Sequence, residues 1–346
     1  MSDGVSVIIC CYNSAQRLPE TLRHLAMQKV STAFPWEVVV VVDRSSKDDT
    51  WKVAESFAGD FAPDQLRVVE ESRRGLGYAR IGGMTAARYE FLSYIDDDNW
   101  VIQEWVETVY RLFSSMADAG AIGGKGEAVF ENGHGPEWFP PFAGHYAASL
   151  QYAEAGDITD KATHLLWGAG LCLRKSAFEK LVESGFEFTC TERLGSELYT
   201  LISMRPGEDT DLCYGIRALG WRLYYTPALS YKHLLAQNRL SWSYLRRMAR
   251  ETGQSSVFLS LLRGSTDRSL SPWKLNLERN WIFQAARALR RLGRIALRNP
   301  RSVLTTDEGS VDRAQADFWM GFLKVLLILR GRYGELFDEN RRRFIR

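Results

Sequence analysis

Short runs of apolar and β-branched residues alternate with segments of helical periodicity over the first hundred residues. The apolar runs cover residues 5–11, 38–42, 66–69 and 91–95. The helical segments stand between them at residues 18–28, 51–57 and 79–89. This order predicts a βαβαβαβ arrangement. Strands joined through helices are almost always parallel, so their carboxyl ends meet at one edge of the sheet, where ligand sites of open α/β sheets lie.

The pattern changes after residue 100. Glycine and proline crowd residues 120–145, which predicts a long excursion with little regular structure, and a second loop is expected at residues 189–207. Residues 165–173 resemble a strand with a close backbone approach. A short extended segment is expected to end near His233, and from about residue 239 onward the pattern is helical.

Two predicted strands end in acidic residues. Asp43 follows the second apolar run, and Asp96, Asp97 and Asp98 follow the fourth. Successive carboxylates repel one another and lose solvation when buried. Mg²⁺ or Mn²⁺ would balance them, because these cations prefer oxygen ligands and need few protein carboxylates when they also bind phosphates. The alternative is a helix start, where acids favour the positive end of the helix dipole.

The glycine-rich stretch at residues 74–80 resembles a dinucleotide loop only in part. Arg80 stands where the third glycine is needed, and no P-loop motif occurs, which disfavours nicotinamide and P-loop nucleotide binding. A basic turn that enters a helix still suits a phosphate group.

A second group of candidates lies beyond residue 200. Glu208, Asp209 and Asp211 lie at the start of an amphipathic segment, and His233 follows the extended one. Helix capping and catalysis explain these acids equally well. His233 is equally a structural histidine or a metal ligand.

Charge and cysteine content narrow the classes of protein. Residues 1–238 carry 22 basic and 32 acidic side chains (net −10), whereas residues 239–346 carry 22 and 10 (net +12), so the two parts are expected to do different jobs. The total of only +2 argues against a dedicated nucleic-acid binder. Five cysteines without a C-x-x-C pair indicate reduced thiols in the cytoplasm. The apolar runs are too short for a signal peptide or a membrane span, which disfavours an integral membrane protein.

The motifs together carry a family resemblance. In order, they are residues 5–13, Asp43 with Ser46, Asp48 and Thr50, then Ala79-Arg80, Asp96-Asp97-Asp98, Gly207-Glu208-Asp209 and His233. This set resembles the inverting, nucleotide-sugar-dependent glycosyltransferases of family 2, over about residues 4–250. The segment from Trp167 to Trp242 looks especially like enzymes of bacterial cell-surface polysaccharide synthesis.

The resemblance implies an α/β protein of the GT-A fold, a Rossmann-like mixed sheet flanked by helices, with a C-terminal helical extension. Residues 1–238 would form the catalytic domain, with a nucleotide-binding half at 1–100 and an acceptor-binding half at 101–238. Residues 239–346 would form the basic helical region.

It also implies roles around the donor. Asn13 and Asp43 match positions beside the nucleotide, with Asp43 as partner of the uracil N3–H. Arg80 lies in the donor-binding turn. Asp96 is expected near the ribose, and Asp97 beside it in the same donor site.

The remaining roles concern the metal ion and the reaction. Asp98 is expected to bind Mn²⁺ or Mg²⁺, and His233 to contact the metal or the diphosphate. Asp209 matches the catalytic base, and Glu208 its neighbour at the acceptor side. The chain would thus move a sugar from a nucleoside diphosphate sugar to a hydroxyl of a glycan or lipid-linked saccharide.

Four positions depart from the family pattern and bear on the choice of nucleotide. Cys10 and Cys11 stand where Pro and Thr are frequent, Arg44 replaces a second Asp, and Ile81 replaces an Asn. They alter the nucleotide pocket rather than the reaction centre. UDP is therefore the favoured nucleotide, with GDP and dTDP left open.

Two interpretations stay open both for the acceptor site and for the amphipathic C-terminal segment. Trp138, Trp167 and Asp211 are candidates for the acceptor site, with core packing as the alternative for the tryptophans. Within residues 281–298 apolar residues and arginines occupy separate helical faces, which suits an anionic membrane on the inner face of the plasma membrane; a solvated face is the alternative. No nucleic-acid partner is expected. The competing functions are a sugar-nucleotide pyrophosphorylase and a non-catalytic nucleotide- or carbohydrate-binding module.

Overall fold

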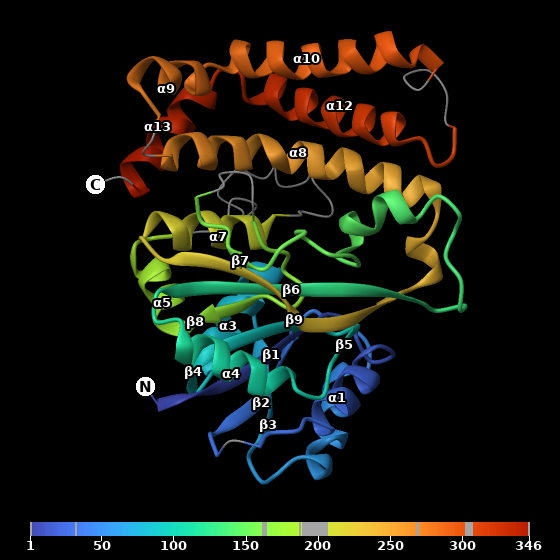
Figure 1. Cartoon of the computed structure of the whole chain (residues 1–346), viewed down its shortest axis with the longest axis vertical. Coiled ribbons are helices and arrows are strands. Elements are labelled where there is room, and N and C mark those ends of the chain that lie inside the picture. Colours follow the sequence, from blue (N-terminus) through green and yellow to red (C-terminus); the bar gives the residue numbers. More distant parts are fainter. Residues whose placement is uncertain are drawn as a thin grey trace. The chain divides into compact units, whose positions relative to one another are not determined.

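The computed structural model describes residues 2–31, 33–160, 165–186, 188, 207–267, 270–301 and 307–344. The chain divides into two compact units (Figure 1). The first unit comprises Met1–Phe130, Ala143–Glu183 and Leu219–Leu235, and the second comprises Glu131–Phe142, Ser184–Ala218 and Ala236–Arg346. Of the loop expected at residues 189–207, only Gly207 lies among the described residues. The domain boundaries drawn from the sequence remain predictions.

The first unit is built on a mixed sheet with nine strands in the described residues, in the order β3-β2-β1-β4-β8-β6-β9-β5, with β7 beside β9. The strands are β1 (Ser2–Cys11), β2 (Trp36–Asp43), β3 (Leu66–Glu71), β4 (Tyr89–Asp96), β5 (Asn99–Val101), β6 (Ala119–Phe130), β7 (Gly156–Asp157), β8 (Cys172–Arg174) and β9 (Arg222–Leu235). Strands β1 to β4 pair in parallel, and β8 pairs antiparallel to β4 and β6. The predicted mixed α/β architecture is confirmed.

Helices follow the first strands as the periodicity predicts. They are α1 (Leu18–Ala26), α2 (Thr50–Ser56), α3 (Leu76–Ala86), α4 (Trp105–Ser115) and α5 (Lys175–Glu183). Strand β2 is buried along almost its whole length, as expected of a parallel strand covered on both faces. Helix α3 begins three residues earlier than predicted, directly after Gly75, whose φ of 130° suits glycine and turns the chain into the helix.

The expectation of an irregular excursion at residues 120–145 is wrong for its first half, because Ala119–Phe130 is strand β6. Its glycines serve close packing rather than loop formation. A Cβ on Gly124 would lie 2.2 Å from the carbonyl oxygen of Leu229, and one on Gly126 would lie 1.9 Å from that of Ala147. Only a residue without a side chain fits at these two places.

The later extended segments also differ from the prediction. Of residues 165–173, only Cys172 and Leu173 belong to a strand, β8. The close approach is nonetheless real: Gly170 has φ 69°, and a Cβ there would lie 2.8 Å from the Tyr231 ring. The short segment expected before His233 is part of the 14-residue strand β9.

The second unit is helical, as predicted for the basic C-terminal region. Its helices are α7 (Glu208–Ala218), α8 (Trp242–Thr266), α9 (Pro272–Arg279), α10 (Trp281–Arg298), α12 (Val311–Leu329) and α13 (Tyr333–Phe344). An apolar core including Phe258, Phe322, Leu326 and Phe337 joins α8, α12 and α13. None of the described helices combines the length and hydropathy needed to cross a membrane.

A buried charge cluster joins α8 to α12. The fully buried carboxylate of Asp317 accepts hydrogen bonds from Arg246 at 2.7 Å, Arg250 at 2.6 Å and Arg313 at 3.0 Å. Burial alone would raise the pKa of Asp317, but the three arginine hydrogen bonds outweigh it and hold the pKa below its ordinary value of 3.8. One carboxylate therefore keeps three guanidinium groups in place.

Substituting Asp317 with Ala is expected to destabilise the second unit by about 3–5 kcal/mol, because it removes the buried carboxylate that three arginines share. The matched control is Asp338→Ala, which removes a more exposed ion pair with Arg279 on the same unit and should cost about 1 kcal/mol or less. Urea unfolding of both variants checks this. Because the folded pKa is depressed, the Asp317 contribution should be complete above the ordinary pKa and disappear as the pH falls through the folded one. Equal effects of the two substitutions would contradict the assignment.

Candidate functional site

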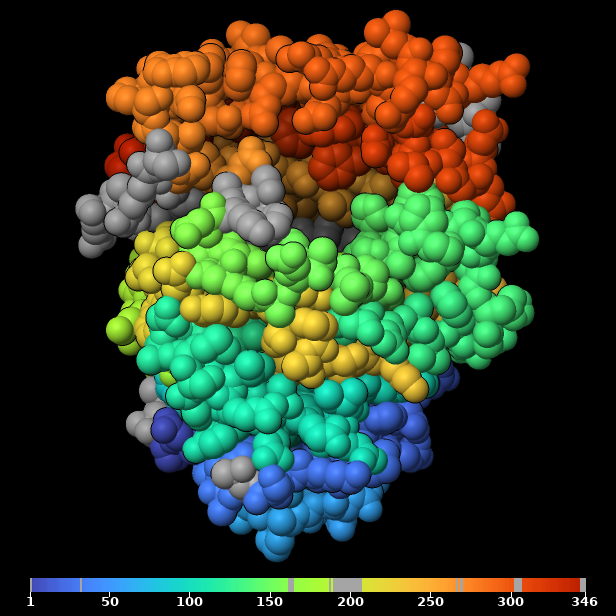
Figure 2. All heavy atoms as spheres, viewed as in Figure 1, coloured from blue at the N-terminus to red at the C-terminus, as the bar shows by residue number. Residues whose placement is uncertain are grey.

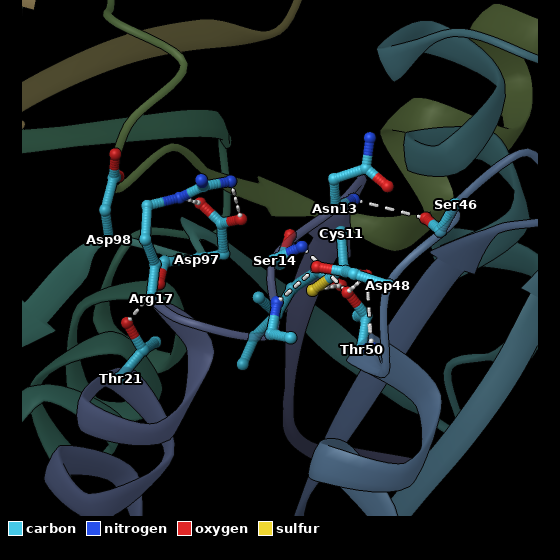
Figure 3. A network of polar contacts seen from close by, with 12 residues as sticks. Cys11, Asn13, Ser14, Arg17, Thr21, Ser46, Asp48, Thr50, Asp97 and Asp98 are labelled. Atoms are coloured by element: carbon cyan, nitrogen blue, oxygen red, sulfur yellow. Dashed lines mark hydrogen bonds and ion pairs between the residues drawn. The ribbon is translucent and has the colours of Figure 1, made fainter. Parts of the chain in front are cut away.

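The carboxyl ends of β1 and β2 are tied together by hydrogen bonds between the loops that follow them. The Asn13 backbone N–H donates to Ser46 Oγ at 3.2 Å, and its side-chain Oδ1 accepts from the Lys47 N–H at 2.8 Å. The Ser14 N–H donates to Thr50 Oγ1 at 2.7 Å (Figure 3). Asn13 adopts a positive φ of 50°, which asparagine tolerates better than most residues. The Asn13 side chain thus braces this edge of the sheet.

Asp43 ends β2 and is buried at the same edge. Its Oδ1 accepts hydrogen bonds from the backbone N–H and the hydroxyl of Ser45, at 2.8 and 2.6 Å. Its Oδ2 lies 3.4 Å from the Gly75 N–H, at the start of α3. The carboxylate therefore connects the β2 and β3 loops.

Arg80 lies on the buried face of α3 and contributes positive charge to the ends of β1 and β4. Its carbonyl accepts a hydrogen bond from the Tyr94 hydroxyl at 2.8 Å. Burial raises the pKa of the Cys10 thiol to about 12, and the Arg80 guanidinium partly opposes this rise. The same positive charge opposes the rise in the pKa of Asp96. Burial, followed by the Asp98 charge, dominates at Asp96 and raises its pKa to about 6. The sequence-predicted residues Arg80 and Asp96 thus lie together.

Asp97 turns toward α1 rather than toward its acidic neighbours. Its two carboxylate oxygens accept hydrogen bonds from Arg17 Nη2 at 2.6 Å and Nε at 3.2 Å. Its backbone carbonyl accepts one from the Thr21 hydroxyl at 2.8 Å (Figure 3). Both carboxylate oxygens of Asp97 thus bind Arg17, which connects the turn after β4 to α1. A role of Asp97 in donor binding remains a prediction.

Asp98 and His233 face one another across the β5–β9 pair. His233 Nε2 lies 3.4 Å from Asp98 Oδ1, and both side chains are buried. His233 Nδ1 lies 2.7 Å from the Tyr146 carbonyl oxygen. Because a carbonyl can only accept, Nδ1 carries the hydrogen, and in the neutral ring Nε2 presents its lone pair to Asp98.

This pair suits a divalent cation of the kind that the family resemblance implies. A carboxylate oxygen and an imidazole lone pair are both donors to metals, and the hydrogen bond from Nδ1–H to a carbonyl is the usual support of a metal-binding histidine. Among the described residues no group of three or more His, Cys, Asp or Glu side chains is arranged to hold a metal ion. Two protein ligands still fit Mg²⁺ or Mn²⁺, which take their other ligands from phosphates and water.

The acids of the second unit lie in the first turn of α7. Glu208 and Asp209 are partly exposed, whereas Asp211 is 1% exposed. The Thr210 N–H donates to Asp209 Oδ1 at 2.7 Å, so one oxygen of that carboxylate is engaged locally. A partly exposed carboxylate such as Asp209 can accept a proton from a ligand, whereas the buried Asp211 is badly placed for that contact.

The two tryptophans considered for the acceptor differ in their surroundings. Trp138 is buried in an aromatic cluster with Phe142 and Trp242, at centroid distances of 6.0 and 5.6 Å, and its Nε1–H donates to Glu308 at 2.7 Å. This matches the core-packing alternative. Trp167, in the first unit, is half-buried. Acceptor binding by either residue remains a prediction.

Three residues of the site escaped sequence reasoning. Arg17 binds Asp97, 80 residues away in the sequence, and the Tyr146 carbonyl binds His233, 87 residues away. No local motif marks Arg17 or Tyr146. Tyr12 is 43% exposed at the end of β1, and the Arg74 guanidinium lies 5.6 Å from its ring centroid. An aromatic residue directly after a buried strand was a signal that could have identified Tyr12.

Comparisons with known proteins place this geometry in a family. The glucosyl-dolichyl phosphate glucuronosyltransferase of Haloferax volcanii is 24% identical over 75% of this chain and 78% of its own length. The succinoglycan biosynthesis protein ExoM of Rhizobium meliloti is 22% identical over 72% and 73%. Six further curated relatives match over 15% to 41% of their own length.

Among solved structures, the mannosyltransferase PcManGT from Pyrobaculum calidifontis, in complex with GDP-Man and Mn²⁺, shares 18% identity. The match covers 96% of this chain and 88% of that one, with a TM-score of 0.52, which supports the GT-A-like fold. Residues 6–182, just over half of the chain, match the family described as Glycosyl transferase family 2. The chain therefore belongs to glycosyl transferase family 2.

Proposed function

We propose that this protein is a metal-dependent inverting glycosyltransferase that uses a UDP-sugar. The observation that carries the proposal is the Asp98–His233 pair, in which the Tyr146 carbonyl fixes the imidazole tautomer so that two metal donors face each other. Family membership supplies the sugar-transfer reaction. Among the described residues, the thiols of Cys10, Cys11 and Cys172 form no disulfide, which supports a reducing, cytoplasmic location.

The nucleotide would lie over the carboxyl ends of β1 and β2. The exposed Tyr12 ring offers a flat surface for a base, and the carboxylate of Asp43 is an acceptor for the uracil N3–H. Asp96 lies beside Arg80 and is placed to accept a hydrogen bond from a ribose hydroxyl, while Arg80 contributes positive charge. Uracil presents a single N–H donor, at N3, which one carboxylate satisfies, so the proposed site needs no second acid at the position of Arg44.

Asp98 and His233 would hold Mn²⁺ or Mg²⁺ against the diphosphate. The bound cation neutralises the charge that develops on the nucleoside diphosphate as it leaves, so no protein acid is required. Arg17 keeps Asp97 away from the pair, and the Tyr146 carbonyl keeps the His233 lone pair directed to it. Arg17 and Tyr146 would therefore act as positioning residues.

Asp209 would act as the base. Its carboxylate takes the proton from an acceptor hydroxyl as that oxygen bonds to the anomeric carbon, and the bond from that carbon to the diphosphate breaks. The electron pair leaves with the nucleoside diphosphate, so the sugar inverts in one displacement. Glu208 would contact the acceptor.

The acceptor would be a hydroxyl of a glycan or a lipid-linked saccharide. Two relatives support this class through their names, which specify a glucosyl-dolichyl phosphate and succinoglycan biosynthesis. A non-catalytic module of the same fold would bind the nucleotide without transferring sugar, so turnover separates the two functions.

Thermal unfolding with UDP, GDP or dTDP tests the donor site, each with Mn²⁺, Mg²⁺ or a chelator. UDP with metal, at about 100 times its Kd, should stabilise the chain by about 2.7 kcal/mol, and the chelator should remove most of that shift. A larger shift with GDP or dTDP would contradict the nucleotide assignment, and no shift with any of them would contradict a nucleotide-sugar enzyme.

Asp98→Ala and His233→Ala test the metal pair. Each should raise the Mn²⁺ concentration needed for the UDP shift at least about 10-fold, because each removes a ligand. His134→Ala, at an exposed histidine, is the matched control and should leave the titration unchanged. An unchanged Mn²⁺ requirement in both variants would place the metal elsewhere.

Asp209→Asn tests the base. It should lower transfer from the UDP-sugar that the wild-type chain uses by about 10²- to 10⁴-fold, while the UDP shift is kept, since the amide cannot accept the proton. Asp160→Asn, at a 92% exposed carboxylate, serves as control. Retained turnover in Asp209→Asn would assign the base to Glu208 instead.

A further inference from the structure

Helix α10 carries an exposed apolar stripe in addition to the face that packs into the second unit. Its packed face consists of Gln284, Ala285, Ala288 and Ile295, and it rests on α12. Ile282, Leu289 and Leu297 are 60%, 59% and 87% exposed. They are separated by seven and eight residues, so they return to one side of the helix. Single exposed leucines are ordinary on a protein surface, but a stripe along one helix is not.

A second exposed stripe on α10 is purely basic. The helix contains five arginines and no acidic residue, at Arg287, Arg290, Arg291, Arg294 and Arg298. Arg287 pairs with Glu278 and Arg298 with Asp312. Within the part of the chain that the structure describes, the three central arginines make no ion pair, and all three are exposed. Their charge is therefore available to a partner.

The surroundings of α10 extend this surface. Helix α9 packs against α10 and exposes Trp273 and Lys274, with the Trp273 side chain 62% exposed. The side chains of α9 and α10, in orange, form an outer edge of the second unit (Figure 2). Basic and apolar stripes side by side, with an aromatic residue nearby, have the composition of a helix that lies in a membrane interface.

We propose that the outer face of α10 binds the surface of an anionic phospholipid bilayer, with the helix parallel to the membrane plane. Ile282, Leu289 and Leu297 enter the boundary between headgroups and acyl chains, while Arg290, Arg291 and Arg294 contact lipid phosphates. Charge complementarity selects this occupant, because the arginines need an anionic partner and the leucines need an apolar one, and a bilayer surface offers both. A polyanion such as RNA satisfies only the arginines.

The surface is separate from the proposed donor and metal residues, so its test does not depend on the sugar-transfer proposal. The full chain is floated with vesicles of equimolar phosphatidylglycerol and phosphatidylcholine, and with vesicles of phosphatidylcholine alone. Binding is expected only to the anionic vesicles and should weaken as salt is raised. Failure to float with the anionic vesicles would overturn the proposal.

Two sets of variants separate the electrostatic and the apolar contributions to vesicle binding. Combined Arg290→Glu, Arg291→Glu and Arg294→Glu should lower vesicle binding by about 100-fold or more, since each arginine near an anionic surface contributes about five-fold. The control combines Lys29→Glu, Lys52→Glu and Arg111→Glu, which are exposed on the first unit and change net charge equally. Equal loss in the control would mean non-specific electrostatic attraction and would contradict a site on α10.

Leu289→Ser with Leu297→Ser keeps the charge and should still lower binding by at least about 10-fold, because buried methylene groups are lost. Unchanged binding in this variant, or equally tight retention of RNA, would assign the surface to a polyanion. Sedimentation without lipid adds a check: a wild-type dimer abolished by the serine substitutions, with no vesicle binding, would identify a self-association face. All variants should keep the cooperative urea unfolding transition of the wild type, which shows that they are folded and does not depend on nucleotide binding.

Discussion

The structure of the first unit depends on how the negative charge in the turn from β4 into β5 is balanced. Three consecutive aspartates lie at the carboxyl end of β4, and two of them are buried. Asp97 binds Arg17 from α1, and Asp98 faces His233 from β9. Burial raises the pKa of Asp96, and His233 and Arg80 oppose that rise. Repulsion among the carboxylates is thus offset by groups from other elements. These contacts hold α1 and β9 beside the turn between β4 and β5.

The sequence predicted the frame of this site well because its signals are local. Apolar runs and helical periods located β1 to β4 with their helices, and the strand ends located Asp43 and Asp96 to Asp98. What it missed depends on contacts between distant segments. Arg17 and Tyr146 have no motif of their own. The glycines of β6 indicated a loop, because the backbones that require them, those of Leu229 and Ala147, lie more than 20 residues further along the chain. The exact bounds of strands β8 and β9 were missed for the same reason.

The arginines of the second unit occur in two different environments. Around Asp317 one buried carboxylate binds three arginines, and although the Arg250 side chain is 45% exposed, all three charges are paired within the fold. On α10 the arginines are exposed, and three of them make no ion pair in the described structure. The net charge of this region, +12, does not distinguish these cases. Ion pairing separates the arginines that hold helices together from the arginines whose charge is available to a partner.

Strand β1 lies between β2 and β4, and this position has a consequence for how the protein is made. Val5 pairs with Trp36 on one side and with Phe91 on the other, so the donor edge is assembled from segments far apart in the chain. Such long-range pairings form late and slowly compared with local helices. A folding intermediate in which β1 has only one neighbour would contain Tyr12 and Asp43 but not the β4 turn beside them. Under the proposed function, binding of a nucleotide with its cation would therefore require the complete sheet and would report on full assembly of this unit.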